Sequence, residues 1–313
     1  MNYNSIFKNE LYDFINHKKA LGYKYNCISI INKFDKFCVD LKTKEISQEL
    51  YELWISKKDQ ESNNMQVKKY SFIKNFTNYL IVNGYDNIYY NNDYKIKNNS
   101  KFVPYIFSDD EIFIIFQNLK KFEIKTYDKN DKDNFMLLFT ILYCCGLRIS
   151  EALNIKMSDI NFDNKTIMIL HSKNQQSRII TITDNLIDEI KNFVEKNNIS
   201  KEHYLFHNKY NNKYQYNKVN DIWLKLLNNC GFDNSNHKYR IHNLRHGFAI
   251  KCLNQLENKG YDIYTSLPLV SKYLGHKSIK ETEYYLRLTK NYSNKILDNV
   301  DKYVGKILEN DYE

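Results

Sequence analysis

The sequence lacks most of the features that mark membrane, secreted and metal-binding proteins. No apolar run is long enough to cross a membrane, and no charged-then-apolar stretch opens the chain as a signal peptide would. The six cysteines include no Cys-x-x-Cys pair and no zinc-type spacing with histidine. Glycine occurs only 8 times and forms no phosphate-binding loop. These absences predict a reduced, cytoplasmic protein with buried thiols and neither a metal nor a membrane partner.

Arginine is also scarce. Only five of the 46 basic residues are arginine, and all lie beyond residue 147: Arg148, Arg178, Arg240, Arg245 and Arg287. Unlike lysine, arginine presents a planar, permanently charged fork of donors that can bind a phosphate or carboxylate at two points. A chain that uses lysine for almost every cation is expected to keep arginine where that fork is needed. The arginines therefore mark candidate anion-binding positions.

Length and composition favour a folded protein of two domains. A chain of 313 residues can bury two cores, and 42% hydrophobic with 15% aromatic residues excludes wholesale disorder. The formal net charge of +9 suits a nucleic-acid partner but does not demand one, because the excess is spread evenly along the chain. The 27 tyrosines make any single tyrosine weak evidence for a site.

The first 90 residues have the pattern of a helical domain. Apolar positions recur at helical spacing in four stretches, 5–20, 26–41, 47–57 and 63–83. Gly84 stands where a glycine commonly ends a helix. Residues 91–106 are rich in Asn, Asp, Tyr and Lys, lack this periodicity and include Pro104, so we expect a linker there.

The pattern changes after the linker. Residues 108–111 (Ser-Asp-Asp-Glu) form a capping box that begins a helix, and an apolar helix is expected over 134–145. Two β-branched runs, 166–170 and 178–182, predict a hairpin whose polar turn contains Lys173. Further helices are predicted at 184–197, 217–229, 242–256, 265–274, 278–288 and 292–309. The expected fold class is mainly α with a small antiparallel β-sheet.

Five short motifs follow one another in the second domain. They are Gly146-Leu147-Arg148, Lys173 five residues before Arg178, His242-x-x-Arg245, Gly275-His276, and Tyr285 nine residues after His276. Any one alone is more often an ion pair or a core histidine than a site. As a set in this order and spacing, they closely resemble the tyrosine recombinase, or phage integrase, family of DNA-breaking and DNA-joining enzymes. The resemblance covers about residues 107–289.

The resemblance implies a domain assignment. Residues 1–90 would form a four-helix, SAM-like core-binding domain that contacts DNA, 91–106 a linker, and 107–290 the tyrosine-recombinase catalytic domain. Residues 291–313 contain one apolar stripe and would form a C-terminal helix exchanged between protomers. The implied partners are double-stranded DNA with specific sites, further copies of the chain in a tetramer, and accessory DNA-bending or directionality proteins.

The resemblance also implies the chemistry. Arg148 and Arg245 would neutralise the oxygens of the scissile phosphate. Tyr285 would attack phosphorus to give a 3′-phosphotyrosyl enzyme, and Lys173 would protonate the leaving 5′-oxygen. This chemistry needs no metal, nucleotide or other cofactor.

Histidines and a carboxylate complete the implied site. His242 would support proton transfer at the nucleophile, and His276 would form a hydrogen bond to the phosphate. Glu151, His246 and Arg178 would support the site without reacting.

Several of these positions also have structural interpretations. Arg148 could form a helix-start ion pair with Glu151, three residues along. Lys173 could be an ordinary turn lysine, one of 41. Tyr284 precedes Tyr285 directly, and only the count from the preceding histidine selects Tyr285 as the nucleophile.

The function predicted is site-specific recombination in the integration or excision of a mobile element. Asn174 stands where the family usually has glycine, and the stretch after His276 lacks the paired threonines and the Tyr-Thr-His ending of many members. Together with the opening Leu21-Gly22-Tyr23, these departures make the chain look more like bacterial mobile-element integrases than the enzymes that resolve chromosome dimers. Two further alternatives are DNA relaxation of the type IB topoisomerase kind and DNA binding without catalysis. The apolar stripe of the tail argues against a monomeric topoisomerase, and the presence of every catalytic group argues against mere binding.

Overall fold

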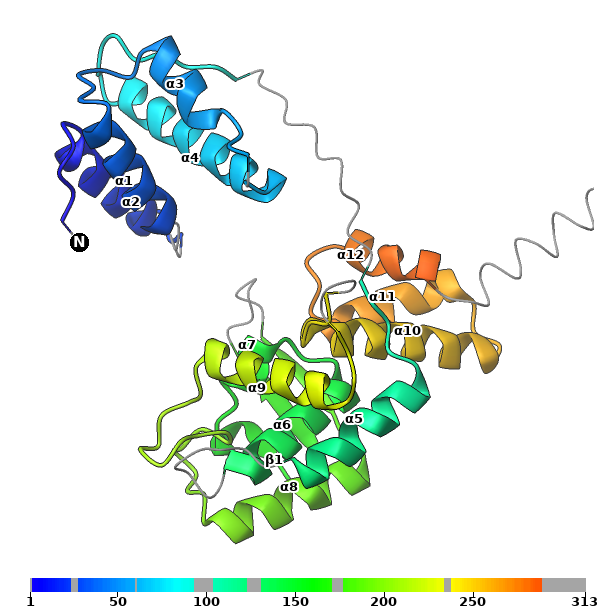
Figure 1. Ribbon diagram of the computed structural model, residues 1–313. Coiled ribbons are helices and arrows are strands. Elements are labelled where there is room, and N and C mark those ends of the chain that lie inside the picture. Colours follow the sequence, from blue (N-terminus) through cyan, green and yellow to red (C-terminus); the bar gives the residue numbers. More distant parts are fainter. Residues whose placement is uncertain are drawn as a thin grey trace, which may run out of the picture. The chain divides into compact units, whose positions relative to one another are not determined.

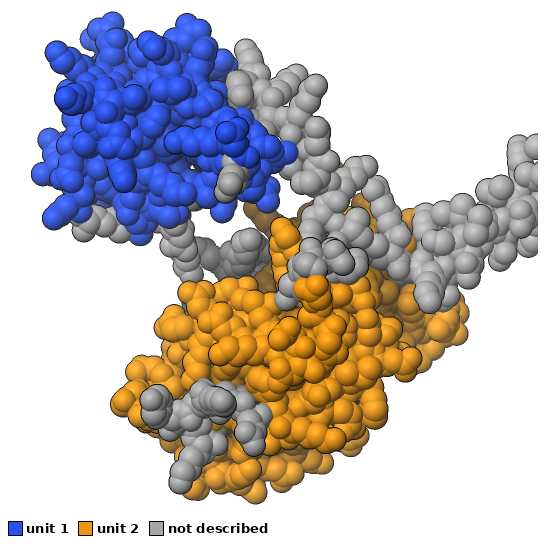
Figure 2. Space-filling view, viewed as in Figure 1, with its two compact units in different colours: residues 1–102 blue, residues 103–313 orange. Residues whose placement is uncertain are grey.

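The computed structural model describes residues 2–23, 28–59, 61–92, 104–122, 131–170, 177–233 and 238–288 (Figure 1). The chain divides into two compact units, residues 1–102 and 103–313, which are coloured separately in Figure 2. The tail helix predicted at 292–309 lies outside the described residues. Within those residues, no helix combines the length and apolar character needed to cross a membrane.

The described part of the first unit contains the four predicted helices. They are α1 (Lys8–Ala20), α2 (Ile28–Asp40), α3 (Gln48–Ile55) and α4 (Asn63–Val82). Ser47 and Ser62 precede α3 and α4 and accept hydrogen bonds from backbone N–H groups of the first turn, which would otherwise lack partners. Gly84 follows α4 with a positive φ of 82°, as the sequence led us to expect of a helix end.

Aromatic side chains fill the core of the first unit. The Phe34 ring lies 5.1 Å from Trp54 and 5.2 Å from Phe72, and Phe14 lies 5.4 Å from Phe76, all between ring centroids. These separations and edge-to-face geometries are those that aromatic pairs favour. The rings come from all four helices, so each helix contributes a face to one core.

The second unit contains most of the helices. Before the sheet come α5 (Asp109–Lys121), α6 (Asp131–Cys145), α7 (Ile149–Ala152) and the 3₁₀ turn η1 (Met157–Asp159). After it come α8 (Asp184–Asn197), α9 (Tyr216–Asn229), α10 (His242–Asn258), α11 (Ile263–Leu274), α12 (Ile279–Glu283) and the 3₁₀ turn η2 (Tyr284–Leu288). The predicted capping box is present: Ser108 accepts from the Glu111 N–H, and the Glu111 carboxylate accepts from the Ser108 N–H.

A small antiparallel sheet lies between these two groups of helices in the sequence. Its strands are β1 (Ile160–Asn161), β2 (Thr166–Ile169) and β3 (Arg178–Thr181), paired in the order β1-β2-β3. Ile167 on β2 lies opposite Ile180 on β3, and both side chains are buried. A shift of one residue would turn these side chains to the other face of the sheet, so their burial fixes the register of the two strands. The sequence predicted β2 and β3 but not β1, because two residues are too few to show alternation.

The second unit contains two hydrophobic clusters, and the smaller one includes Tyr285. In the larger one, the ring of Phe139 on α6 lies 5.1 Å from that of Trp223 on α9. In the smaller one, Leu253 of α10 and Leu274 of α11 pack with Tyr285 of η2. Because Tyr285 belongs to this cluster, the packing of α10 against α11 determines where its hydroxyl lies.

One predicted helix differs in form. The sequence predicted a continuous helix over 278–288, but α12 gives way to the 3₁₀ turn η2 at Tyr284. Tightening of the last turn is common at helix ends, where the final carbonyls lack intrahelical partners. The predicted fold class, mainly α with a small antiparallel sheet, is confirmed.

Candidate active site

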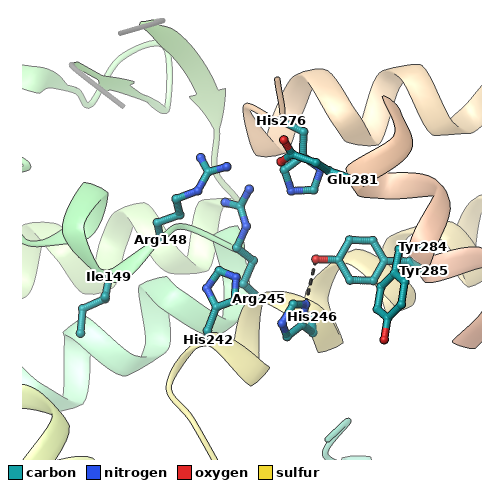
Figure 3. A pocket seen from close by; sticks show the side chains of 9 residues that line it. All are labelled: Arg148, Ile149, His242, Arg245, His246, His276, Glu281, Tyr284 and Tyr285. Atoms are coloured by element: carbon teal, nitrogen blue, oxygen red, sulfur yellow. Dashed lines mark hydrogen bonds between the residues drawn. The ribbon is translucent and has the colours of Figure 1, made fainter. Parts of the chain in front are cut away.

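A pocket of about 510 Å³ opens where α7, α10, α12 and η2 meet (Figure 3). Its lining is rich in basic and aromatic side chains: Arg148, Ile149, His242, Arg245, His246, His276, Glu281, Tyr284 and Tyr285. The residues come from motifs as far apart as 148 and 285 in the sequence. The fold therefore brings five of the six predicted catalytic residues to one cavity.

Glu151 lies beside this pocket and forms ion pairs with three arginines. Its carboxylate is only 2% exposed and accepts from Arg148 at 2.9 Å and from Arg178 at 3.2 and 2.9 Å. A third guanidinium, that of Arg245, lies 3.8 Å away. Burial opposes ionisation of Glu151, but the hydrogen bonds and charges of Arg178 and Arg148 hold its pKa below the ordinary value. The carboxylate is therefore ionised and holds the guanidinium groups in place.

Arg148 is positioned by the turn that precedes it. Gly146 has a positive φ of 59°, and a Cβ there would lie 2.3 Å from the ring of Phe248, so no other residue fits without displacing that ring. Arg148 then stands at the start of α7, where it donates to Glu151 and, at 3.2 Å, to the carbonyl of Gly275. The predicted ion pair with Glu151 is present, and the guanidinium also lines the pocket.

Arg245 is almost completely buried, with a side chain that is 1% exposed. Its guanidinium donates to the carbonyl oxygens of Gly146 at 2.8 Å and Leu274 at 2.7 Å. Burial and then the neighbouring charge of Arg148 lower the pKa of Arg245 to about 10. The group still carries its charge at neutral pH, within the wall of the pocket.

The arginines leave an excess of buried positive charge beside the cavity. Three guanidinium groups share the one carboxylate of Glu151, while the second acid at the pocket, Glu281, is an exposed residue. Burying charge without compensation is costly, so a wall of this kind is stabilised when an anion enters the cavity. Guanidinium forks match the oxygens of a phosphate. The geometry is that of an anion site.

Two half-buried histidines, His246 and His276, flank the tyrosine. His276 Nδ1 lies 2.7 Å from the hydroxyl of the buried Thr282, and its ring lies 6.2 Å from the ring of Tyr285 at an angle of 25°. Burial, followed by the charges of Arg245 and Arg148, lowers the pKa of His276 to about 3. The imidazole is therefore neutral over the physiological range and can donate or accept a hydrogen bond without adding charge.

The hydroxyl of Tyr285 points into the pocket, and its ring is buried (Figure 3). It lies 2.8 Å from Nδ1 of His246, the hydrogen bond drawn as a dashed line in Figure 3. Burial raises the pKa of the Tyr285 hydroxyl, while Arg245 and Arg148 act in the opposite direction. The hydroxyl of Tyr284 points away from both arginines in the same view. Of the two adjacent tyrosines, Tyr285 is the one aimed at the arginines.

Sequence reasoning placed some groups correctly and missed others. Lys173 falls within 171–176, outside the described residues, so its position is untested. Thr282, the partner of His276, was not singled out, because a lone threonine gives no signal of such a contact in the sequence. The contact between His246 and Tyr285 was also missed. Its only signal was that His246 follows His242 by four residues, which places both on one face of α10.

Comparison with known proteins gives the family of the chain. Residues 107–292 match the model of the phage integrase family, and this match spans more than half of the chain. The chain belongs to the phage integrase family. The family predicted from the sequence and the enzyme class, tyrosine-type recombinase, are therefore confirmed.

Individual members of the phage integrase family resemble the chain to different extents. A tyrosine recombinase of Pseudothermotoga lettingae is 29% identical over 256 residues, which cover 80% of each chain. Tyrosine recombinase XerA of Pyrococcus furiosus is 31% identical over 159 residues, and the match spans only about half of each chain (51% and 52%). The XerH recombinase bound to palindromic difH superposes with a TM-score of 0.65 at 18% identity, covering 95% of this chain and 90% of XerH. That last similarity concerns the fold.

Proposed function

We propose that this member of the family is a site-specific DNA recombinase. It would cut one DNA strand by forming a 3′-phosphotyrosyl bond at Tyr285 and rejoin the broken end to a strand of a second site. The observation that carries this proposal is the placement of the Tyr285 hydroxyl in a pocket walled by Arg148 and Arg245. A phosphodiester resists nucleophilic attack because it is anionic, and two fixed guanidinium groups remove that obstacle.

Each side chain of the pocket can be given a role on a bound phosphate. Arg148 and Arg245 neutralise the two non-bridging oxygens. His276 uses Nδ1 on Thr282, which leaves Nε2 to form a hydrogen bond to the phosphate. His242, at the start of α10, lies on the side of the pocket nearer Arg148 and can also reach a bound phosphate (Figure 3).

Departure of the 5′-oxygen requires a proton. We assign that proton to Lys173, in the segment between β2 and β3, as the family resemblance implies. The base of β3 is anchored beside the pocket because Arg178 bonds Glu151 and, through Nε at 2.7 Å, the carbonyl of Tyr273. Lys173 precedes this anchor by five residues, and that length of chain is enough to span the distance from β3 to a phosphate held by the pocket arginines.

The partners follow from the same reasoning. XerH and the Tn1549 transposon integrase have similar folds, and their structures were solved as complexes with DNA. This supports a DNA partner for this chain. The first unit would be the core-binding domain that holds the duplex, and 103–313 would contain the catalytic domain. We further propose that residues 291–313 link four copies on paired DNA sites, with accessory DNA-bending or directionality proteins selecting integration or excision of a mobile element.

Strand transfer between two DNAs tests this function. The protein is incubated with duplexes that span the DNA flanking its gene, and covalent complexes are mapped to single nucleotides. Recombinant joints together with a 3′-linked adduct at Tyr285 are expected. Relaxation of a supercoiled plasmid without joints would point to topoisomerase-like activity, and exchange confined to chromosomal dimer sites would point to dimer resolution. Binding without any adduct would reject the proposal.

A further inference from the structure

The residue in contact with the attacking hydroxyl is His246. Its Nδ1 lies 2.8 Å from the oxygen of Tyr285, and the half-buried ring of His246 lies between that tyrosine and His242 (Figure 3). A group that removes the proton of a nucleophile must lie within hydrogen-bond reach of it, about 2.6–3.2 Å. His246 meets this requirement in the structure as it stands.

His242 occupies a different place. Its ring centroid lies 4.6 Å from that of His246, with the rings at 85°, and it lies on the side of the pocket nearer Arg148 (Figure 3). The order across the pocket is therefore His242, His246 and then Tyr285. A proton that leaves the tyrosine meets His246 first.

Building on the proposed recombinase function, we infer that His246, rather than His242, accepts the proton of Tyr285 during strand cleavage. The Tyr285 oxygen forms a bond to phosphorus, the bond from phosphorus to the 5′-oxygen breaks, and the phenolic proton moves to Nδ1 of His246. The leaving 5′-oxygen takes its proton from Lys173. In the joining step the incoming 5′-hydroxyl attacks phosphorus, the bond to tyrosine breaks, and His246 returns the proton to Tyr285.

Burial and the charges around His246 keep its ring neutral before the attack. Burial, then His242, then Arg245 lower the pKa of His246 to about 3, so the ring is neutral and can accept a proton over the physiological range. The charged or titratable groups at the pocket are His242, Arg245, Arg148, His276, Glu281, Tyr284 and Tyr285. A phosphate bound against the arginines would offset their positive charge and make protonation of His246 easier at the moment of attack. The transfer is therefore coupled to the presence of DNA.

Replacement by asparagine separates proton transfer from positioning. In His246→Asn, a side-chain oxygen or nitrogen occupies nearly the place of Nδ1, so a hydrogen bond to Tyr285 can form. The amide cannot take up a proton near neutral pH. Single-turnover cleavage is measured on a nicked suicide duplex on which the wild-type protein forms its covalent adduct. His207→Asn, at a histidine outside the pocket, is the matched control.

The expected loss in His246→Asn is on the order of a hundredfold in cleavage rate, with DNA binding and melting temperature close to those of the wild type. The wild-type rate should be flat between about pH 6 and 8. In the variant the rate should rise about tenfold per pH unit, because the tyrosine must first lose its proton to solvent hydroxide. His207→Asn should match the wild type.

A sulfur-substituted substrate identifies which proton is affected. When sulfur replaces the bridging 5′-oxygen, the leaving group needs no proton, so a Lys173→Ala defect should be rescued and the His246→Asn defect should remain. Rescue of His246→Asn, or a rate within about threefold of wild type with an unchanged pH profile, would overturn the inference. So would a wild-type rate that itself rises tenfold per pH unit, a test that needs no variant. If the wild-type protein forms no adduct at Tyr285, it is the recombinase proposal that fails.

Discussion

Glu151 and Arg178 are joined at two points, with Oε1 to Nη1 at 3.2 Å and Oε2 to Nη2 at 2.9 Å, although 27 residues separate them. Arg178 begins β3, and Glu151 lies in α7 next to Arg148. A Cβ at Gly275 would lie 2.6 Å from Nη1 of Arg178, so the glycine provides the space that the guanidinium occupies. The pair therefore connects the hairpin, the pocket arginine and the end of α11.

Glu151→Gln should destabilise the fold strongly. The change removes the carboxylate that, among the described residues, the three guanidinium groups share, and losing one partner of a buried ion pair typically costs about 3 kcal/mol or more. Urea denaturation of both proteins at pH 7 measures the loss. Asp184→Asn is the control, because the pair of Asp184 with Lys165 is exposed and such pairs contribute about 1 kcal/mol or less. Equal losses in the two variants would show that burial of the pair is unimportant.

The effect of Glu151→Gln should depend on pH. In the folded protein Arg178 and Arg148 hold the pKa of Glu151 below its ordinary value, so ionisation is easier in the folded state than in the unfolded one. The stabilisation is fully present above the unfolded pKa of about 4.3 and is lost as pH falls through the folded pKa. The difference in unfolding free energy between the wild type and the variant should therefore narrow below about pH 4. A difference that is constant from pH 7 to pH 3 contradicts the prediction.

Arg148→Lys and Arg245→Lys should each lose cleavage on the order of a hundredfold, because an ammonium cannot replace a planar fork on two phosphate oxygens. Their stabilities should differ. Arg245 donates to two buried carbonyl oxygens, those of Gly146 and Leu274, so its replacement should also lower the melting temperature more than that of Arg148. Single-turnover cleavage and thermal melting separate the two effects. Near-normal cleavage in both variants would reduce these arginines to structural ion pairs.

Tyr285→Phe should abolish covalent attachment to a nicked suicide duplex while DNA binding survives. The ring remains packed with Leu253 and Leu274, but the oxygen that faces the arginines is gone. Tyr284→Phe is the control and should retain attachment, because the hydroxyl of Tyr284 points away from the arginines (Figure 3). The reverse outcome would mean that the other tyrosine is the nucleophile.

Deletion of residues 291–313 should leave binding to a single DNA site intact and abolish assembly on paired sites. The apolar stripe of this segment needs a neighbour to cover it, and we propose that a second copy provides the cover. Sedimentation on DNA with one or two sites measures assembly, and thermal melting of the free protein measures stability. Unchanged assembly together with a lower melting temperature would place the tail on its own catalytic domain.

The sequence determined the local structure well because the signals for it are local. Helical spacing and the glycines at helix ends gave α1 to α4, α6 and α8 to α11 nearly at their observed bounds, and the Ser108 capping box gave the start of α5. The short helices α7 and η1 were not predicted. The two-residue strand β1 and the 3₁₀ turn at Tyr284 were missed, since each is too short to leave a periodic pattern. The order of arginine, histidine and tyrosine motifs was sufficient to indicate the family.

The contacts within the site were decided only by the tertiary structure. Nothing in the sequence says that His246 rather than His242 reaches Tyr285, because both lie on one face of α10. Nor does it say that Arg178 bonds Glu151 across 27 residues. These contacts depend on how α10 packs against α11 and how β3 lies beside α7, and that packing is set by the buried side chains of the whole unit. The sequence thus determined which groups could react, and the packing determined which of them touch.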